Sequence, residues 1–470
     1  LEMPAEQRDT SRDFSVRLLN GVAGSGKTLI AIHRALLLAE LFPRQRILVL
    51  IHNTPIVADL KDRLHRARGG LPRNVEMQTF FAWIRRQWRR LFGVFPAIAE
   101  HEDVLELVHH HRLRLPGLSA SDARLVAELD FIDDSLISDE AGYLAARRAG
   151  RGFALRAAER RQVWALYEAV TESLRRRHLH TWSALPRAIC LACNRHAALE
   201  RFHHILADEA QFFAPAWFQV VKLSLAPQGQ LFLCADPQQG FLKNRLSWKS
   251  AGLDVSGRTK KLRRSYRSTQ AILYAAATLL RGAVQPRAGD DFLDPDYADM
   301  DAGKAPALVY AASPQDALDR LVNEIASLHA ERGIPLGAFL VIYGRNVDRR
   351  ALYVRLGRRF GAGRVWWFNE HSQKKEPPQG HGQDYLRMAY VDSATGLEGA
   401  IVFLIGTEPL FFSGEMGAVG DEERREEEAR KLYMAMTRAG RRLVVVASQR
   451  LPERAEEVFD LVPEAPSDVH

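Results

Sequence analysis

Residues 17–40 read RLLNGVAGSGKTLIAIHRALLLAE, an apolar run, a glycine-rich segment and a second apolar run with helical spacing. Within them Gly21, Gly26, Lys27 and Thr28 fit the phosphate-loop pattern G-x-x-x-x-G-K-[ST]. Glycines let successive backbone N–H groups point at phosphate oxygens, and the helix that follows adds the positive end of its dipole. The segment predicts a strand, a loop that holds a nucleoside triphosphate, and a helix. It does not say what the energy is used for, since GTPases, kinases, transporters and motors share the pattern.

The composition is that of a globular chain with a basic balance. The 470 residues suffice for about two to four domains, and 47% apolar with 26% charged residues is ordinary. The net charge of +8 suits a polyanionic partner. The three cysteines do not make a disulfide scaffold, no apolar run is long enough to span a bilayer, and the first residues, LEMPAEQRDTSRDF, are polar. We therefore expect a cytoplasmic protein without a membrane partner.

A second motif supplies the acidic group that a phosphate loop needs for its metal ion. The segment HHILADEAQ places Asp208 and Glu209 directly after a short apolar run. Asp208 would hold Mg²⁺ together with Thr28, while Glu209 would orient or deprotonate the attacking water. An Asp-Glu pair alone also occurs at helix N-termini, but the phosphate loop and the preceding strand favour the catalytic interpretation. Such a pair after a strand is typical of nucleotide hydrolysis that drives work.

Short β-rich runs alternate with helical patterns at both ends of the chain. SVRLLN, RILVLI, HHILADEA and QLFLCADP read as strands in the first half, and FLVIYG, AIVFLIG and RLVVVAS in the second. Between them, residues 84–199 show helical periodicity and almost no strand signal. The pattern predicts two doubly wound α/β domains with buried parallel strands, the first interrupted by a helical insertion. We expect the first domain over residues 1–83 and 200–262, and the second over residues 263–470.

The ordered motifs resemble superfamily 1 helicases of the UvrD/Rep/PcrA kind, and the similarity covers most of the chain. ADEAQ, LFLCADPQQGF, LRRSYRSTQAIL, VDSATGLEGAIVFLIG and ARKLYMAMTRAGRRLVVVAS are similar to successive motifs of that family. The resemblance implies two RecA-like phosphate-loop domains, with residues 84–199 as the helical domain called 1B. It also implies ATP and Mg²⁺ at the nucleotide site and single-stranded or tailed duplex DNA as the partner.

The resemblance further implies a role for each residue of the nucleotide site. Gln7 would read the adenine and Tyr266 would stack on it. Gln239 would sense the γ-phosphate, which Arg267 and Arg438 would reach from the second domain when the cleft closes. Such an arginine stabilises the transition state by a factor of ~10³–10⁵. The implied catalytic set is Lys27, Asp208, Glu209, Gln239, Arg267 and Arg438. The implied nucleotide contacts are Gln7, Gly21, Gly24, Ser25, Gly26, Lys27, Thr28, Tyr266 and Glu398.

The segments that resemble the family's DNA-contacting motifs are altered more than the hydrolytic ones. RILVLIHNTPIVADLKDRL resembles motif Ia, but it carries Ile51 and His52 where the family has a Thr-Phe pair. In motif V, Thr395 replaces a lysine. Trp248 would offer a base-stacking platform, a contact typically worth ~1–3 kcal/mol per base, or it would be a core residue. The implied DNA contacts are His52, Asn53, Thr79, Phe80, Phe81, Trp248 and Ser393.

Members of the family carry a further domain, called 2B, between motifs IV and V, where this chain has only a polar loop at residues 369–384. We expect a compact motor that translocates on single-stranded DNA, 3′ to 5′ by resemblance, in DNA repair, recombination or defence. Without 2B it would unwind duplex poorly alone, or unwind only with a partner subunit. Two alternatives stay open: an RNA-directed motor and an ATP-switched nucleic-acid-binding subunit of a larger complex. A protein partner or an associated nuclease fits either.

Overall fold

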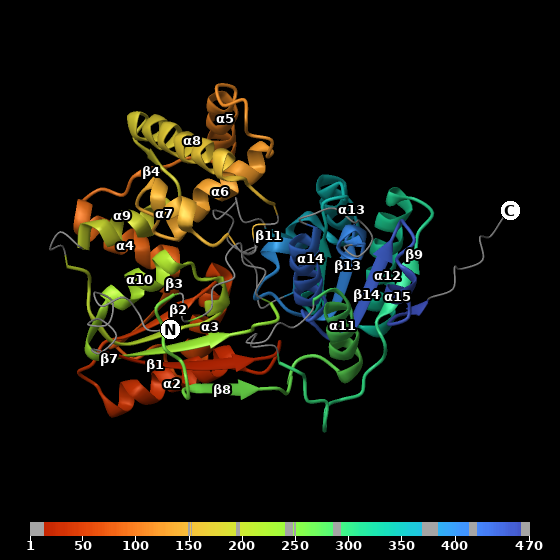
Figure 1. Cartoon of the computed structure of the whole chain (residues 1–470). Coiled ribbons are helices and arrows are strands. Elements are labelled where there is room, and N and C mark those ends of the chain that lie inside the picture. Colours follow the sequence, from red (N-terminus) through yellow and green to blue (C-terminus); the bar gives the residue numbers. More distant parts are fainter. Residues whose placement is uncertain are drawn as a thin grey trace. The chain divides into compact units, whose positions relative to one another are not determined.

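The computed structural model describes residues 14–148, 151, 153–193, 198–239, 248, 251–284, 293–368, 384–412 and 421–461. The chain divides into two compact units. Unit 1 consists of Leu1–Asn20, Lys27–Ala235 and Leu242–Lys261, and unit 2 consists of Gly21–Gly26, Asp236–Phe241 and Leu262–His470. Each unit contains one large β-sheet with helices on its faces (Figure 1).

A six-stranded sheet forms the centre of unit 1, with the strand order β3-β2-β6-β7-β1-β8. The five strands from β3 to β1 pair in parallel. All five residues of β2 are buried, because its sequence ILVLI offers apolar side chains to both faces of the sheet, as covered parallel strands require. The strands are β1 (Phe14–Gly21), β2 (Ile47–Ile51), β3 (Val75–Thr79), β6 (Phe202–Ala207), β7 (Leu225–Ala235) and β8 (Thr259–Leu262).

Helices cover both faces of this sheet. α4, α9 and α10 pack on one face, where Leu50 and Ile205 meet Trp83 and Phe218 in one hydrophobic core. α2 and α3 contact β2, β3 and β7 and cover the other face, because alternate strand residues such as Val49 point away from that core. The helices are α2 (Lys27–Leu41), α3 (Thr54–Arg68), α4 (Phe80–Phe92), α9 (Ala184–Cys193) and α10 (Pro215–Leu223).

Four further helices of unit 1 form a helical body with a hydrophobic core of its own (Figure 1). They are α5 (His101–Arg112), α6 (Asp122–Asp134), α7 (Glu140–Ala145) and α8 (Ala157–Arg176), and a two-stranded parallel ribbon, β4 (Ala97–Ile98) with β5 (Leu179–His180), accompanies them. The insertion predicted from helical periodicity is therefore present. Its predicted start at residue 84 falls inside α4, which belongs to the core of the sheet, while the separate core begins at Ala99.

A buried carboxylate organises the interior of this helical body. Glu128 is fully enclosed, accepts a hydrogen bond of 2.7 Å from the Tyr143 hydroxyl, and lies 3.0 Å from Nε of Arg151 and 2.5 Å from Nε of Arg148. Burial alone would raise the pKa of Glu128, but the bonds and charges of the two arginines hold it below the usual value. These arginines serve the interior and are not surface charges.

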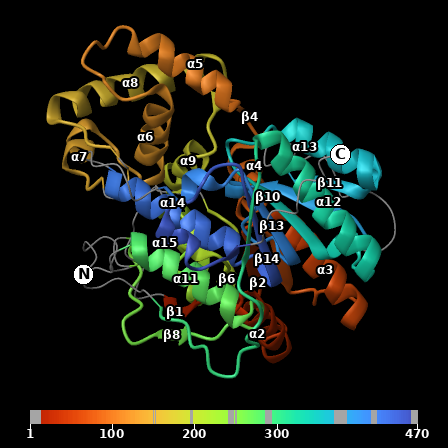
Figure 2. The ribbon, with the colours of Figure 1, turned by 90° about the vertical axis from the view of Figure 1, so that its right-hand side faces the viewer.

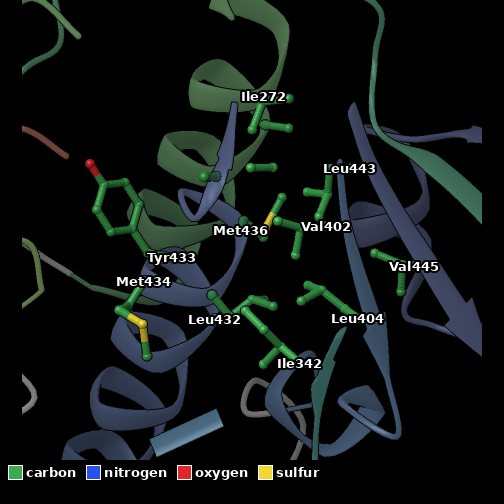
Figure 3. Close-up of a cluster of buried hydrophobic side chains, with 14 of the residues drawn as sticks. Ile272, Ile342, Val402, Leu404, Leu432, Tyr433, Met434, Met436, Leu443 and Val445 are labelled. Carbon is green, nitrogen blue, oxygen red and sulfur yellow. The ribbon is translucent and has the colours of Figure 1, made fainter. Parts of the chain in front are cut away.

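A seven-stranded sheet forms the centre of unit 2, with the order β11-β12-β10-β13-β14-β9-β15 and parallel pairing throughout. α12 and α13 cover one face and α11 and α14 the other, as Figure 2 shows. The core between the sheet and α14 holds Ile342, Val402, Leu404 and Leu432 (Figure 3). The strands are β9 (Ala307–Tyr310), β10 (Phe339–Tyr343), β11 (Val365–Phe368), β12 (Leu386–Tyr390), β13 (Gly399–Ile405), β14 (Ala439–Ala447) and β15 (Asp460–Leu461). The helices are α11 (Gln270–Ala283), α12 (Pro314–Arg332), α13 (Arg349–Phe360), α14 (Asp421–Met436) and α15 (Glu453–Glu456).

The predicted fold class is confirmed: the chain is α/β, with two sheets built from parallel strands. All seven apolar runs that predict strands lie in β1, β2, β6, β7, β10, β13 and β14. Residues 369–383 of the polar loop lie outside the described residues. Among the described helices, none combines the length and the apolar composition that a membrane span needs.

Candidate functional site

The phosphate-loop lysine and threonine open helix α2 in unit 1. Thr28 donates a hydrogen bond of 2.5 Å from its hydroxyl to Oδ2 of Asp208, the residue that follows β6. The contact arises because β6 and β1 run parallel on either side of β7, so that their C-terminal ends lie at the same edge of the sheet. Lys27 is buried, its carbonyl oxygen accepts a weak bond from the Cys234 thiol at 3.5 Å, and its charge acts on Asp208.

Asp208 has the surroundings of a metal ligand. It is buried, and burial raises its pKa to about 6, with the nearby charge of Glu209 adding to the rise. The bond from Thr28 and the charge of Lys27 oppose that rise. Its second oxygen, Oδ1, is enclosed and has no hydrogen-bond partner among the described residues. A carboxylate and a hydroxyl oxygen side by side, with one carboxylate oxygen unsatisfied, fit Mg²⁺, which prefers oxygen ligands.

Glu209 is held in an uncommon backbone conformation beside Asp208. Its φ of 52° lies in the left-handed region, which non-glycine residues seldom occupy, and it starts the single turn η1 (Ala210–Phe212). Gln211 in that turn donates a hydrogen bond of 2.5 Å to Oε2 of Glu209. The turn therefore fixes the carboxylate of Glu209, the predicted catalytic base. Gln211, which supports it, is not among the residues predicted from the sequence.

The glycines of the phosphate loop belong to unit 2 and are conformationally demanding. Gly24 has a φ of 73° and Gly26 a φ of 85°, so both occupy the left-handed region that glycine adopts without strain. The carbonyl of Gly24 accepts a hydrogen bond of 2.8 Å from the Tyr266 N–H. A Cβ atom at Gly24 would lie 2.5 Å from the Ser265 hydroxyl and 2.6 Å from Cβ of Arg267. Only glycine fits this approach.

A buried polar network in unit 2 joins Gln239 to Arg438. The Arg438 side chain is only 2% exposed, donates from Nη2 to Oε1 of Gln239 at 3.0 Å and donates from Nε to the Met434 carbonyl at 3.0 Å. The Gln239 amide in turn donates to Oδ2 of Asp236 at 2.8 Å. Two residues from remote parts of the sequence, both predicted to act on the γ-phosphate, are thus brought into direct contact.

Tyr433 extends this network and is absent from the sequence predictions. Its hydroxyl donates a bond of 2.8 Å to Oε1 of Gln238, the neighbour of Gln239. Figure 3 shows the Tyr433 hydroxyl turned away from the apolar side chains around it. The segment KLYMAMTRAG gives a possible signal, because Tyr433 and Arg438 lie on the last turns of one helix and just beyond it.

The structure describes most of the other residues that are predicted to contact the nucleotide. Arg267 pairs with Glu398 at 2.6 Å, so two residues that were predicted from separate motifs contact each other directly. Tyr266 is 77% exposed, and the Arg264 guanidinium lies over its ring, 5.8 Å from the centroid. Ser25 is buried. Gln7 lies outside the described residues.

The comparison with known proteins agrees with these features. The model of the UvrD/REP helicase N-terminal domain matches residues 5–249, just over half of the chain. The chain belongs to the UvrD/REP helicase family. A Mycoplasma pneumoniae protein named as a probable DNA helicase is 24% identical over 260 residues, which are 53% of this chain and 44% of that protein. Bacillus subtilis YjcD, which is named as a putative ATP-dependent DNA helicase, is 24% identical over 353 residues, which are 71% of this chain and 44% of YjcD.

This UvrD/REP family chain therefore spans less than half the length of both relatives. Among solved structures, the C-terminal domain of a possible DNA helicase from Lactobacillus plantarum WCFS1 has 20% identity and a TM-score of 0.29. The alignment covers 42% of this chain and 98% of that domain.

The DNA contacts implied by the family resemblance have mixed surroundings. Phe80 is only 3% exposed and stacks on Trp217 with ring centroids 4.3 Å apart, so it packs as a core side chain, and its role in DNA contact stays a prediction. Thr79 accepts the Ala82 N–H at 3.2 Å and caps helix α4, and the neighbouring Phe81 is partly buried against Trp182.

The remaining predicted DNA contacts lie at strand ends and turns. His52 follows β2, is half-buried, and its ring centroid lies 4.9 Å from that of Phe212. Burial lowers the pKa of His52, while the negative charge of Glu209 opposes this lowering. Asn53 precedes α3. Trp248 is partly buried and meets Phe218 edge to face at 6.0 Å, and Ser393 is buried in the turn η4 (Val391–Ser393).

Proposed function

We propose that this chain is an ATP-driven motor of the UvrD/REP family that moves along single-stranded DNA. The observation that carries the proposal is the contact between Thr28 and Asp208, with Glu209 held beside them by the turn that follows. This arrangement suits hydrolysis of a nucleoside triphosphate.

Each unit contributes its own part to hydrolysis in this proposal. Lys27 would neutralise charge on the β- and γ-phosphates, while Thr28 and Asp208 would hold Mg²⁺. Mg²⁺, when bound, supplies the positive charge that screens the phosphate oxygens. Glu209 accepts a proton from the attacking water, because its carboxylate is fixed by Gln211.

The second part comes from unit 2. Arg438 and Arg267 stabilise the charge that develops on the γ-phosphate, and the exposed ring of Tyr266 stacks on the adenine. Since Gln239 contacts Arg438 directly, loss of the γ-phosphate changes the charge that both residues face. Domain closure with ATP and opening after hydrolysis then give a step along the strand, 3′ to 5′.

The DNA is bound by fewer stacking contacts than the family motifs imply. Phe80 is withdrawn into the core, so His52, Phe81 and Trp248 are the proposed aromatic contacts. We propose that the chain translocates but unwinds duplex weakly without a partner, since β11 ends at Phe368 and β12 begins at Leu386, which leaves no length for a further packed domain. Repair, recombination and defence are the proposed settings.

The deciding experiment is steady-state ATP hydrolysis alone, with single-stranded DNA and with RNA of matched length. Lys27→Ala is the blank. The motor proposal predicts strong stimulation by DNA over RNA, and dissociation kinetics that depend on strand length. Equal rates with and without either strand would reject a DNA motor.

A second candidate function is an ATP-switched DNA-binding subunit of a larger complex. The burial of Phe80 and the Thr395 side chain at the lysine position of motif V favour it, because both reduce the grip on a strand. A switch would bind DNA differently with ATP and with ADP, but its dissociation would not depend on strand length. Length-independent dissociation therefore separates the switch from the motor.

A further inference from the structure

The outer surface of α13 in unit 2 carries a row of arginines. Leu352, Leu356 and Phe360 of this helix are buried against the sheet. Arg350, Val354 and Arg358 are exposed and follow each other at intervals of four residues, so they share one face of the helix. From the helical rise, Arg350 and Arg358 are about 12 Å apart along the axis.

Neighbouring arginines of the unit have acidic partners, whereas those on this face have none among the described residues. Arg355, on the side of α13, lies 2.9 Å from Asp319, and Arg364, just beyond the helix, pairs with Asp384. Among the residues that the structure describes, no carboxylate lies within salt-bridge distance of four exposed arginines. We call these four the α13 arginine face: Arg349, Arg350, Arg358 and Arg359.

A shallow cavity of about 480 Å³ continues this face beyond the N-terminal end of the helix. Arg345, Arg349 and Arg350 line it, together with Tyr343 and Tyr390 at the ends of two strands. The acid on its wall, Asp348, is engaged within the helix, because its carboxylate accepts the N–H groups of residues 350 and 351 at 3.0 and 2.9 Å. The basic surface therefore extends over the helix and its cap, with the Asp348 carboxylate at its edge. The charges of Asp392 and Glu427 act on Arg345.

We propose that the α13 arginine face binds the phosphate backbone of duplex DNA that flanks the single strand on which the motor works, an inference that rests on the proposed function. The exposed stripe of Arg350, Val354 and Arg358 has no aromatic side chain on which an unpaired base could stack, and stacking is what single-strand sites add to charge. In the adjoining cavity the Tyr343 ring is buried and packs against that of Tyr390, with ring centroids 5.7 Å apart. Duplex DNA offers one charge per ~1.7 Å of axis, the densest phosphate array for a row of guanidinium groups. Binding is independent of sequence, because no group on the face reads base edges.

The test compares two double variants that remove the same charge. Arg350→Ala with Arg358→Ala alters the face. Arg281→Ala with Arg442→Ala is the matched control, since Arg281 pairs with Asp294 and Arg442 with Glu324. Affinity for a single strand, a blunt duplex and a tailed duplex is measured by fluorescence anisotropy between about 50 and 200 mM salt.

The proposal predicts that the face variant loses about 10-fold or more in duplex affinity, and that its salt slope on duplex falls by about 2, near 0.9 for each lost phosphate contact. Single-strand affinity and the thermal midpoint stay as in the control. Equal losses on the single strand would overturn it in favour of a single-strand site, and an unchanged duplex slope would overturn it outright. Failure of the proposed function would be seen in a separate measurement: single-stranded DNA would not stimulate ATP hydrolysis by the unaltered chain.

Discussion

Replacing Arg438 with alanine tests the central network of unit 2. The guanidinium is almost fully enclosed and donates to Oε1 of Gln239 and to the Met434 carbonyl, both at 3.0 Å. Arg438→Ala leaves Oε1 of Gln239 without this donor, while the Met434 carbonyl still accepts from the Thr437 hydroxyl at 3.0 Å. An unsatisfied buried acceptor costs ~1–3 kcal/mol, so we expect the free energy of unfolding to fall by about 1–3 kcal/mol. If Arg438 also acts on the γ-phosphate, kcat falls by about 10³-fold or more.

Urea denaturation and DNA-stimulated ATP hydrolysis measure the two effects on the same preparation. Arg442→Ala is the control, because Arg442 is more exposed and pairs with Glu324 at the surface. It should change stability by less than ~1 kcal/mol and leave kcat as it is. A folded Arg438→Ala variant whose kcat stays within 10-fold of the unaltered chain would refute the role of Arg438 in hydrolysis while leaving its structural role intact.

Three further perturbations follow from the structure. Burial raises the pKa of Asp133 to about 6, so the folded state favours the protonated carboxyl, and this contribution to stability is lost as pH rises from about 4 through 6. Asparagine does not ionise, so the free energy of unfolding of Asp133→Asn relative to the unaltered chain should grow with pH by up to about 3 kcal/mol. A difference in urea midpoints that stays constant with pH would contradict this. Gly24→Ala should abolish binding of a fluorescent ATP analogue, because the new Cβ would lie 2.5 Å from the Ser265 hydroxyl. In Gly26→Ala the new Cβ meets nothing within 4 Å, so this change should lower stability by only ~1–2 kcal/mol through backbone strain. Equal effects of the two changes on binding would be inconsistent with the loop geometry. Phe80→Ala should cost about 3–5 kcal/mol in thermal or urea unfolding and leave the single-strand affinity of the folded protein unchanged, whereas a selective loss of affinity would restore Phe80 as a DNA contact.

The sequence was sufficient to predict the elements whose signal is local. Runs such as ILVLI are apolar throughout, which only a strand covered on both faces tolerates, and the phosphate-loop spacing fixes where β1 ends and α2 begins. It also predicted that Thr28 and Asp208 share a task, because residues that follow parallel strands meet at one edge of a sheet.

Features that depend on packing between remote segments were beyond it. Phe80 and Phe81 are adjacent and chemically alike, yet helix α4 turns the first into the core against Trp217 and leaves the second partly exposed. Local spacing contains no information on the bond between Tyr433 and Gln238, since these residues are distant in the chain. The predicted start of the insertion falls inside α4 for the same reason: α4 is helical like the insertion, but its apolar face packs on the sheet.

The strand order of unit 1 has a consequence for how the chain folds. β1, which carries the phosphate loop, has β7 and β8 as its neighbours, and both are synthesised only after the helical body of α5 to α8. That body is contiguous in sequence and has its own core, so its contacts are local and form early. If the helical body folds first, it shortens the flexible segment between β3 and β6. Pairing these parts of the sheet then costs less conformational entropy. We therefore expect Thr28 and Asp208 to come together late during synthesis, after the helical body has folded.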